Sequence, residues 1–522
     1  MHDRPTILRR ATRGAPWWLA AVAALMLMAA APARADGPQD LNGVDGYVDG
    51  EGRWFTDDEG RVMFFRGFVW PYKREPWLID AAGVGEDDAQ FVADEGFNLM
   101  QVRFTYQGLE PAPGQYDEAY MDRVVALVKQ LTSRGVRVFI QANQGGWGPA
   151  VGGHGFPPWA TYTGGRPNPD VPFGFSYILN PATNKAFDNF WANRTSPRGD
   201  GLQDGFAKAV AELGRRLADD PLFLGVDVLN EPWLGSDWPG CFPIGRINPA
   251  GCRKFDRTKL KPFYERFIDT VRPAMPRQMV LYEPTPTFDL GIPTGLDDIG
   301  GDDGNVGFSF HAYCALDGGG ADLKPLPFER LKTRFCTKEE DDIMDYAHEH
   351  AAAQGVPMLS SEFGATPLAS TTARLMALHE RRIVPWTYAA YCCRDASQEA
   401  SGDVILDPKK PPTEDNLDQE KLRVLVRPYP AALAGVPTRM AFDPASRSYE
   451  LRFTTSRPGG GAYDAGTESV VQVPKRQYPD GYAVTELTGA RVTSVPGAEQ
   501  LTLVAETGAE EVVLKIGPRP AA

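Results

Sequence analysis

Two glutamates in this chain stand in short motifs whose residue types could carry acid–base and nucleophilic chemistry. Glu231 lies in residues 228–233, with the sequence VLNEPW, and Glu362 lies in residues 359–365, with the sequence LSSEFGA. Each motif follows an apolar, strand-like run. The carboxyl ends of parallel strands are where an α/β barrel builds its active site. We therefore predict that both carboxyl groups face one pocket.

Two carboxyl groups at one pocket are what the hydrolysis of a glycosidic bond requires. One protonates the leaving oxygen, and the other attacks the anomeric carbon. The Asn-Glu-Pro tripeptide alone is weak evidence, because short motifs recur by chance. The second motif strengthens the interpretation, since it follows another buried strand. Together the motifs predict an enzyme whose catalytic residues are Glu231 and Glu362.

The elements that must position these glutamates are eight strand-like runs that alternate with helical patterns. The predicted strands are residues 62–69, 97–104, 136–142, 223–229, 279–282, 306–310, 357–360 and 383–389. The predicted helices are residues 120–133, 206–217, 262–271, 343–353, 371–379 and 417–426. Strands and helices in this alternation predict an α/β fold, a (β/α)8 TIM barrel.

Long inserts follow the third and fourth predicted strands. Residues 145–180 are rich in glycine, proline and aromatic residues, and residues 233–255 hold Trp238 and the first pair of cysteines. Long loops on the catalytic face of a barrel usually carry substrate contacts. Ordinary packing of the loops against the barrel is the alternative interpretation.

The pattern changes near residue 432, where short alternating strands separated by glycine and proline begin. They are residues 449–454, 469–473, 482–486, 501–504 and 511–516. They predict a small β-sandwich, which we expect to cap the barrel; sugar binding and membrane contact are the alternatives. We divide the chain into a signal peptide (1–35), a catalytic barrel (36–432) and a C-terminal β-sandwich (433–522).

The first 35 residues have the form of an export signal. Three arginines lie between residues 9 and 13, an apolar run covers residues 17–31, and residues 33–35 (ARA) form a small-x-small cleavage site. The apolar run is short for a membrane span, so we favour cleavage over membrane anchoring. We expect a secreted protein, extracellular or in the cell envelope, with no transmembrane segment in the mature chain.

The formal net charge of −14 argues against nucleic acid and anionic headgroups as partners. It does not exclude a substrate that sits in a membrane or micelle. We expect a monomer.

Six cysteines, an even number in a chain expected to be exported, predict disulfides. The predicted pairs, each of which flanks a loop, are Cys241–Cys252 and Cys314–Cys336. The adjacent Cys392 and Cys393 stay open, because they could bond to each other, pair elsewhere or remain reduced. No zinc site is predicted, since neither a Cys-x-x-Cys pair nor clustered histidines support tetrahedral coordination.

Beyond the glutamate motifs, many segments resemble glycoside hydrolase family 5, and within it the endoglycoceramidases, which release an intact oligosaccharide from ceramide. These segments are FRGFVWPYK (65–73), FNLMQVR (97–103), EPAPGQYD (110–117), PPWA (157–160), FDNFW (187–191), GLQD (201–204), GFSFHAYC (307–314) and LVRPYP (425–430). Cys241, Cys252 and the C-terminal β domain also occupy matching places. The resemblance covers most of the mature chain.

The resemblance implies a role for each residue at the reacting bond. It makes Glu231 the general acid/base and Glu362 the nucleophile. Asn230 would hold the sugar 2-hydroxyl, and Arg103 would support the nucleophile. Tyr313 would lie near Glu362.

The remaining implied contacts line the sugar subsites. His311 would border the reacting sugar, Trp386 would be a stacking platform at the end of strand eight, and Lys73 would contact a hydroxyl. From the residues alone, His311 could instead be a satisfied core histidine, Trp386 part of the barrel core, and Lys73 a surface lysine. Residues 143–145 read Asn143-Gln-Gly where the endoglycoceramidases show His-Gln-Asp, and residues 106–107 read Tyr-Gln where Trp-Glu is expected. The sugar preference should therefore differ.

A retaining mechanism places the two carboxyl groups about 5–5.5 Å apart and needs no metal or organic cofactor. Glu362 must be ionised, and a nearby Arg103 would lower its pKa. Glu231 must be protonated, and we expect the second carboxylate to raise its pKa. The predicted activity is hydrolysis of the bond between glycan and ceramide. The alternatives are a β-glucosidase or endoglucanase of the same fold, and a non-catalytic glycolipid-binding protein.

Overall fold

The computed structural model describes residues 46–172, 174–241, 249–301, 303–314, 329–393 and 402–520 of the chain. All of them belong to one compact unit, residues 40–522. The predicted signal peptide lies outside the described residues.

Eight parallel strands close into a barrel, in the order β4-β5-β6-β7-β8-β9-β10-β11 and back to β4. They are β4 (Arg66–Trp70), β5 (Leu99–Phe104), β6 (Arg137–Ala142), β7 (Phe223–Asp227), β8 (Met279–Tyr282), β9 (Val306–Ala312), β10 (Met358–Gly364) and β11 (Trp386–Ala389). The strands are buried on both faces, which explains why they read as apolar runs without alternation. The predicted TIM barrel is confirmed.

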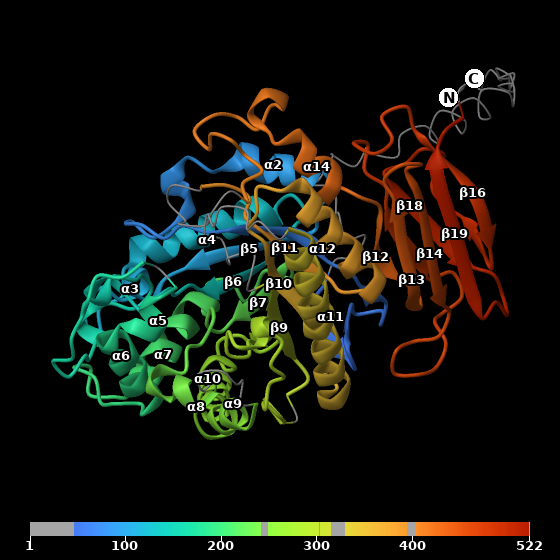
Figure 1. The fold of residues 1–522 in the computed structure, drawn as a ribbon. Helices are drawn as coiled ribbons and strands as arrows, with labels where there is room; N and C mark the ends of the chain where they lie inside the picture. Colours follow the sequence, from blue (N-terminus) through green and yellow to red (C-terminus); the bar gives the residue numbers. More distant parts are fainter. Residues whose placement is uncertain are drawn as a thin grey trace, which may run out of the picture. The chain divides into compact units, whose positions relative to one another are not determined.

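Helices surround these strands, which lie at the centre of Figure 1. They are α2 (Glu86–Asp94), α4 (Glu118–Thr132), α7 (Leu202–Arg215), α10 (Lys261–Val271), α11 (Glu329–Gln354), α12 (Ala369–Arg382) and α14 (Gln419–Leu425). Asp117 and Asp418 cap α4 and α14 by accepting a hydrogen bond from the third backbone N–H of each helix. The apolar stripe of each helix can then pack against the barrel.

Shorter helices occupy the loops after the strands. They are α3 (Tyr106–Leu109), α5 (Ser176–Leu179), α6 (Pro181–Trp191), α8 (Trp238–Cys241) and α9 (Pro249–Phe255). In the insert after β6, Trp147 stacks on Phe156 with ring centroids 4.0 Å apart, and Phe187 and Phe190 contact the same indole. These aromatic side chains are buried. These aromatic residues therefore belong to the same hydrophobic core as the barrel.

The remaining strands form two antiparallel sheets. The first has the order β1-β2-β3-β12-β15-β18-β17, and the second has the order β13-β14-β19-β16. Their bounds are β1 (Asp49–Glu51), β2 (Trp54–Thr56), β3 (Val62–Met63), β12 (Tyr429–Leu433), β13 (Val436–Asp443), β14 (Ser448–Thr454), β15 (Glu468–Gln472), β16 (Tyr482–Thr488), β17 (Ala490–Val492), β18 (Gln500–Ala505) and β19 (Glu511–Pro518).

The two sheets share one apolar core, to which Val471 and Leu503 contribute from the first sheet and Leu451 and Leu514 from the second. The predicted strand 62–69 is divided at Phe64 and Phe65, so β3 joins the first sheet while β4 enters the barrel. The proposed boundary at residues 432 and 433 falls inside β12.

Three disulfides are present among the described residues. Cys241–Cys252 joins α8 to α9, and Cys314–Cys336 joins the end of β9 to α11. Both pairs were predicted from the sequence. The adjacent Cys392 and Cys393 form the third bond. Among the described helices, none is long and apolar enough to cross a membrane.

Candidate active site

Glu231 lies just beyond β7 on a backbone held by the loop after β6. Gln144 Nε2 donates hydrogen bonds to the carbonyl oxygens of Asn230 and Glu231, at 2.8 and 2.9 Å. Asn230 returns a bond from Nδ2 to the Gln144 carbonyl at 3.0 Å. Glu231 adopts a positive φ of 45°, a conformation that costs a non-glycine residue energy and that clusters at active sites. The hydrogen bonds keep its carboxyl group at the carboxyl end of the barrel.

Glu362 lies within β10, which extends four residues beyond the predicted strand. The register against β9 shifts between Ser360 and Glu362. Arg103 from β5 donates a hydrogen bond through Nη2 to Oε2 of Glu362, and the Tyr313 hydroxyl donates to Oε1 at 2.6 Å. The side chains of Arg103 and Glu362 are 2% and 8% exposed. The structure therefore holds this carboxylate in a fixed, charge-assisted position.

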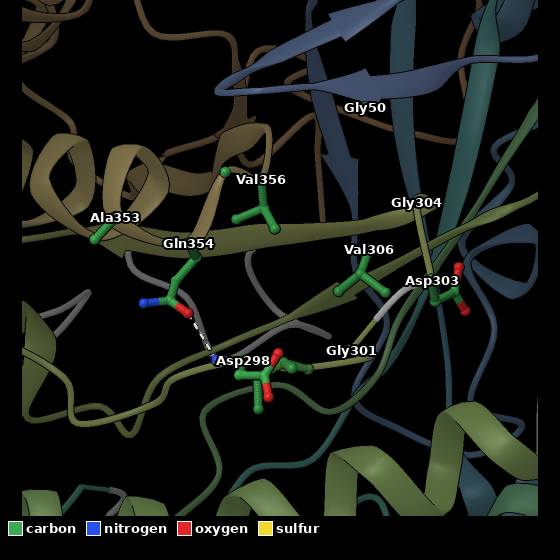
Figure 2. A pocket seen from close by; sticks show the side chains of 11 residues that line it. Gly50, Asp298, Gly301, Asp303, Gly304, Val306, Ala353, Gln354 and Val356 are labelled. Atoms are coloured by element: carbon green, nitrogen blue, oxygen red, sulfur yellow. Dashed lines mark hydrogen bonds between the residues drawn. The ribbon is translucent and has the colours of Figure 1, made fainter.

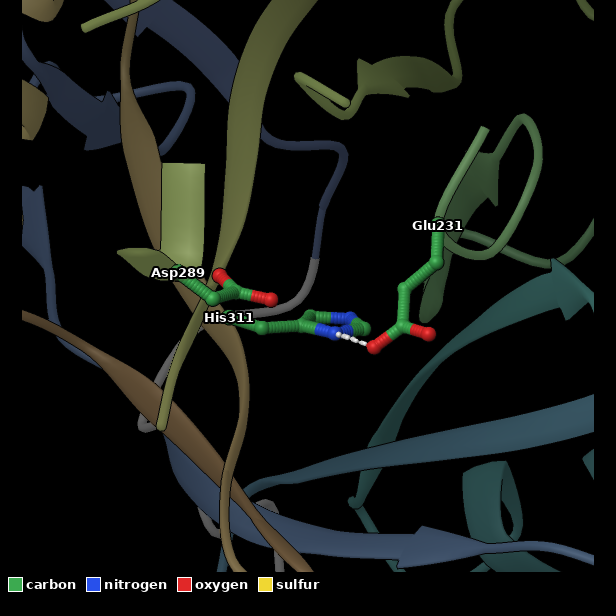
Figure 3. A group of neighbouring side chains, drawn as sticks. All are labelled: Glu231, Asp289 and His311. Carbon is green, nitrogen blue, oxygen red and sulfur yellow. Dashed lines mark hydrogen bonds and ion pairs between the residues drawn. The ribbon is translucent and has the colours of Figure 1, made fainter. Parts of the chain in front are cut away.

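His311 in β9 brings the two glutamates to one ring. Its Nδ1 lies 3.0 Å from Oε1 of Glu231, and its Nε2 lies 3.5 Å from Oε2 of Glu362. Figure 3 shows the ring directed at the Glu231 carboxylate, with Asp289 from a neighbouring loop beside it. The two predicted catalytic carboxylates thus border the same imidazole.

The charges around the pair set their protonation. Burial raises the pKa of Glu362, but the positive charges of Arg103 and His311 outweigh it, so the net shift is downward, as the sequence predicted. Burial likewise raises the pKa of Glu231, but the hydrogen bond and charge of His311 outweigh it and lower that pKa. The expectation of a raised pKa for Glu231 is therefore wrong for the free enzyme. The reason is the imidazole between the two carboxylates, which reasoning from the glutamates alone had not included.

The pKa of His311 moves in the opposite direction. Burial alone would lower it, but Glu283, Glu362 and Glu231 raise it well above its ordinary value. The resting site therefore holds an imidazolium beside Glu231.

Three acidic residues of the site were missed by the sequence analysis. Glu283 follows β8, Asp227 ends β7, and Asp289 lies in a short helical turn, Phe288–Leu290. Burial raises the pKa of Asp227 and of Asp289 well above the usual range. The position of Glu283 directly after a predicted strand was a usable signal, because the same reasoning had selected Glu231.

Asn143 and His154 are two buried polar residues close to the catalytic pair. Gly145 and His154 exchange backbone hydrogen bonds at 3.0 and 2.9 Å, which brings a histidine from the insert beside residues 143–145. Within the described part of the chain, neither polar atom of the Asn143 side chain has a hydrogen-bond partner, and the same holds for Nε2 of His154. Burial and the charges of Lys73 and Arg103 lower the pKa of His154, so its ring is neutral.

Trp386 does not lie where the sequence analysis placed it. It is the first residue of β11, is fully buried, and contacts Phe363 and Phe97 edge-on at 5.4 and 6.3 Å. The carboxyl end of β11 carries Ala389 followed by Ala390. Trp386 is therefore barrel core and not a stacking platform, because the strand begins three residues later than predicted and ends in small side chains.

A hollow lies at the opposite end of the barrel strands. It has a volume of about 440 Å³ and is lined by residues that include Val306, the first residue of β9, and Asp298. Figure 2 shows the Asp298 backbone N–H bonded to Gln354 Oε1 at 2.6 Å. This hollow lies at the amino end of β9, whereas the catalytic pair lies at the carboxyl ends.

A (β/α)8 barrel with two carboxylates on one imidazole, one of them paired with an arginine and a tyrosine, defines the class of a glycoside hydrolase. The family model "Cellulase (glycosyl hydrolase family 5)" matches residues 57–393, and "Glycoside hydrolase family 5 C-terminal domain" matches residues 427–516. The chain belongs to glycoside hydrolase family 5, and it is a glycosidase.

Individual relatives agree with the resemblance seen in the sequence. The chain is 31% identical to Endoglycoceramidase I of Rhodococcus hoagii (strain 103S) over 89% of its own length and 87% of that protein. It is 23% identical to an Endoglycoceramidase of Cyanea nozakii over 85% of its own length and 88% of that protein. The solved structure of Endo-glycoceramidase II from Rhodococcus sp. matches with a TM-score of 0.70 and 25% identity, covering 91% of this chain and 99% of that chain.

Proposed function

We propose that this protein is a secreted, retaining β-glycosidase that hydrolyses the bond between the glycan and the ceramide of glycosphingolipids. The observation that carries the proposal is the 31% identity to an endoglycoceramidase, which spans both domains rather than the catalytic motifs alone.

The mechanism follows from the roles of the two glutamates. Glu362 attacks the anomeric carbon, and a covalent glycosyl-enzyme forms while the ceramide oxygen departs with a proton from Glu231. Water then attacks the same carbon, Glu231 accepts its proton, and Glu362 is released. Arg103 and the Tyr313 hydroxyl keep Glu362 anionic and aimed between turnovers.

The polar atoms without partners support a glycan in the adjoining space. Asn143, His154 and Oδ1 of Asn230 have unpaired atoms that are buried within the described residues. Buried polar groups cost free energy unless they are hydrogen-bonded, and sugar hydroxyls can donate to them and accept from them. We propose that Asn230 binds the 2-hydroxyl and that Asn143, His154 and Lys73 bind hydroxyls of the first or second sugar.

Two features support a restricted substrate range. His154, which belongs to the insert, lies beside residues 143–145. At those positions this chain has Asn143 and Gly145 where the endoglycoceramidases have His and Asp. The end of β11 carries alanines in place of an aromatic platform. Hydroxyl contacts, and not stacking on the end of β11, therefore select the sugar.

Secretion is proposed from residues 1–35 and is supported by the three disulfides, which persist in oxidising compartments. N-terminal sequencing of the exported protein tests it. A mature chain that begins near residue 36 is expected.

The test of the substrate is mass spectrometry of the products from a panel of glycosphingolipids in detergent, with soluble β-glucan alongside. The expected result is an intact glycan and free ceramide from a subset of the lipids, and no product from the matched variant Glu362→Gln. Efficient cleavage of β-glucan with every ceramide glycoside untouched would establish the glucosidase or endoglucanase alternative. Binding without any cleavage by the natural chain would establish the non-catalytic alternative.

A further inference from the structure

Glu283 is a buried carboxylate beneath the catalytic acid for which the two-glutamate mechanism has no use. It is 2% exposed. Its Oε2 accepts the backbone N–H of Glu231 at 2.8 Å, and its Oε1 accepts Nε2 of Gln141 at 2.7 Å. Nε2 of His311 lies 3.5 Å from the same Oε1. Each oxygen of Glu283 thus accepts one hydrogen bond, one of them from the backbone of the catalytic acid, and His311 lies within ion-pair distance.

The imidazole of His311 lies between Glu283 and Glu231, and Glu231 is the residue that acts on the reacting bond. Nε2 is flanked by Glu283 and Glu362, and Nδ1 lies 3.0 Å from Glu231. A ring with carboxylates near both nitrogens favours the doubly protonated form. Nδ1 is within hydrogen-bond distance of Glu231, whereas Nε2 faces Glu283 and Glu362 at ion-pair distance and has no hydrogen-bond partner among the described residues. The hydrogen that the catalytic acid needs then sits on Nδ1, one hydrogen bond away from Glu231.

We propose that His311, held by Glu283, stores the catalytic proton and exchanges it with Glu231 in each half of the reaction. As the bond between Glu362 and the anomeric carbon forms and the bond to the leaving oxygen breaks, Glu231 gives a proton to that oxygen and receives the Nδ1 proton of His311. When water attacks and the bond to Glu362 breaks, the proton from water passes to Glu231 and back to Nδ1. No other reactant is consumed.

The charge of the nucleophile Glu362 changes during the reaction, and this change alters how strongly His311 holds its proton. Glu362 is an anion 3.5 Å from Nε2 in the free enzyme, and it becomes a neutral ester in the glycosyl-enzyme. The imidazolium therefore loses one stabilising anion at the step in which its proton is required, and it regains that anion when the ester is cleaved. Glu283 keeps its place throughout, because Gln141 and the backbone of Glu231 hold both of its oxygens.

Other charged groups reach His311 from every side of the barrel. They are Asp227 from β7, Glu231 after β7, Glu283 after β8, Asp289 beside the ring, Glu362 from β10, Arg103 from β5 and Lys73 after β4. Asp227 and Asp289 hold their protons, because burial raises the pKa of each. Glu231, Glu283 and Glu362 therefore surround the His311 ring, with Arg103 and Lys73 as the neighbouring basic side chains.

The proposal rests on the assignment of Glu231 as the acid/base, but not on ceramide as the leaving group. Aryl glycosides of an accepted sugar and a 2-deoxy-2-fluoro glycoside that traps the glycosyl-enzyme are therefore the probes. If no ceramide glycoside is cleaved, the role of His311 can still be tested with these probes. Failure of the proposed substrate and failure of the proposed proton exchange can therefore be told apart.

The first measurement is the ¹⁵N NMR spectrum of histidine side chains in the mature enzyme. Burial lowers the pKa of His348, His350 and His379 to about 4, and it also lowers that of His154. A single imidazolium signal is therefore expected near pH 7, and the variant His311→Gln should remove it. In the trapped glycosyl-enzyme the titration of this signal should fall by about one pH unit or more. A neutral His311 in the free enzyme, or an unchanged titration after trapping, would overturn the proposal.

The second measurement is the pH profile of kcat/KM for Glu283→Gln, which preserves the shape of the side chain and removes its charge. The basic limb, which reports the free enzyme, should move to lower pH by about one unit, with KM little changed. Asp227→Asn is the matched control, because this neighbouring carboxyl already carries its proton, and its basic limb should stay in place. Equal shifts in both variants, or no shift in a folded Glu283→Gln, would reduce Glu283 to a structural role.

Discussion

Replacing Arg103 by glutamine should move the acid limb of kcat/KM to higher pH and weaken the fold. Arg103 is 2% exposed, and its guanidinium donates to a Glu362 carboxylate that is 8% exposed. Two unit charges about 4 Å apart interact by about 4 kcal/mol at an effective dielectric constant of about 20. At about 1.4 kcal/mol per factor of ten, this is an upper limit of about 10³ on the loss of ionised nucleophile. In the variant the positive charge of His311 still lowers the pKa of Glu362. We therefore expect a loss of about 10²-fold in kcat/KM on the acid side.

The stability change has a defined sign. The pKa of Glu362 is lowered in the folded protein, so the carboxylate stabilises the fold above the pKa it has in the unfolded chain. That contribution is lost as pH falls through the folded-state pKa. Removing Arg103 removes the contribution and leaves a buried charge with one partner fewer, which costs about 3–5 kcal/mol. Urea unfolding at neutral pH and at pH 4 measures both effects, and the difference between variant and parent should shrink at the lower pH.

The chain offers a matched control in a second buried pair. Arg66 Nη2 lies 3.4 Å from Glu380 Oε1, with side chains 1% and 4% exposed, at the amino end of β4. Arg66→Gln should also reduce the free energy of unfolding, but it should leave the acid limb of kcat/KM in place. If Arg103→Gln leaves the limb unmoved, or if Arg66→Gln moves it equally, the electrostatic account of Glu362 is wrong.

Two further predictions concern the roles of single residues. Glu362→Gly should lose activity on aryl glycosides, and azide should restore turnover with a glycosyl azide of inverted configuration, because no nucleophile remains on that face; an inverted azide from Glu231→Ala instead would reverse the two assignments. Trp386→Ala should lower the free energy of unfolding by about 3–5 kcal/mol, since a fully buried indole is removed, while KM for an aryl glycoside stays within about twofold in the folded variant; a large rise in KM would restore the stacking role.

The barrel could be predicted because its strands are buried on both faces. Each of them is a predominantly apolar run between helical patterns, and all eight predicted runs overlap a barrel strand. The same property hides the ends of strands, since a run without alternation carries no register. Strand β11 shows the consequence: the run from Ile383 contained the strand, but Trp386 begins it, and the small residues from Ala389 end it. The proposed platform failed for that reason.

Long-range neighbours were the other hidden part. His154 reaches residues 143–145 only because the insert folds back and pairs with Gly145. Strand β3 pairs with β12, 371 residues further along the chain by the Val62–Leu433 register. Neither partner can be inferred from local sequence, because backbone pairing across a long connection leaves no periodic pattern at either end.

The sign of the Glu231 pKa shift shows how a pairwise argument fails in a crowded site. Two carboxylates considered alone repel, so one of them should hold a proton. The structure places an imidazole between them and a third carboxylate behind it, and the most favourable position for the proton becomes the ring. The acid is then defined by the Glu231–His311 pair, and the group that carries the proton changes as Glu362 gains and loses its charge. A carboxylate with a lowered pKa in the free enzyme can act as the general acid because its proton is one hydrogen bond away when the leaving oxygen needs it.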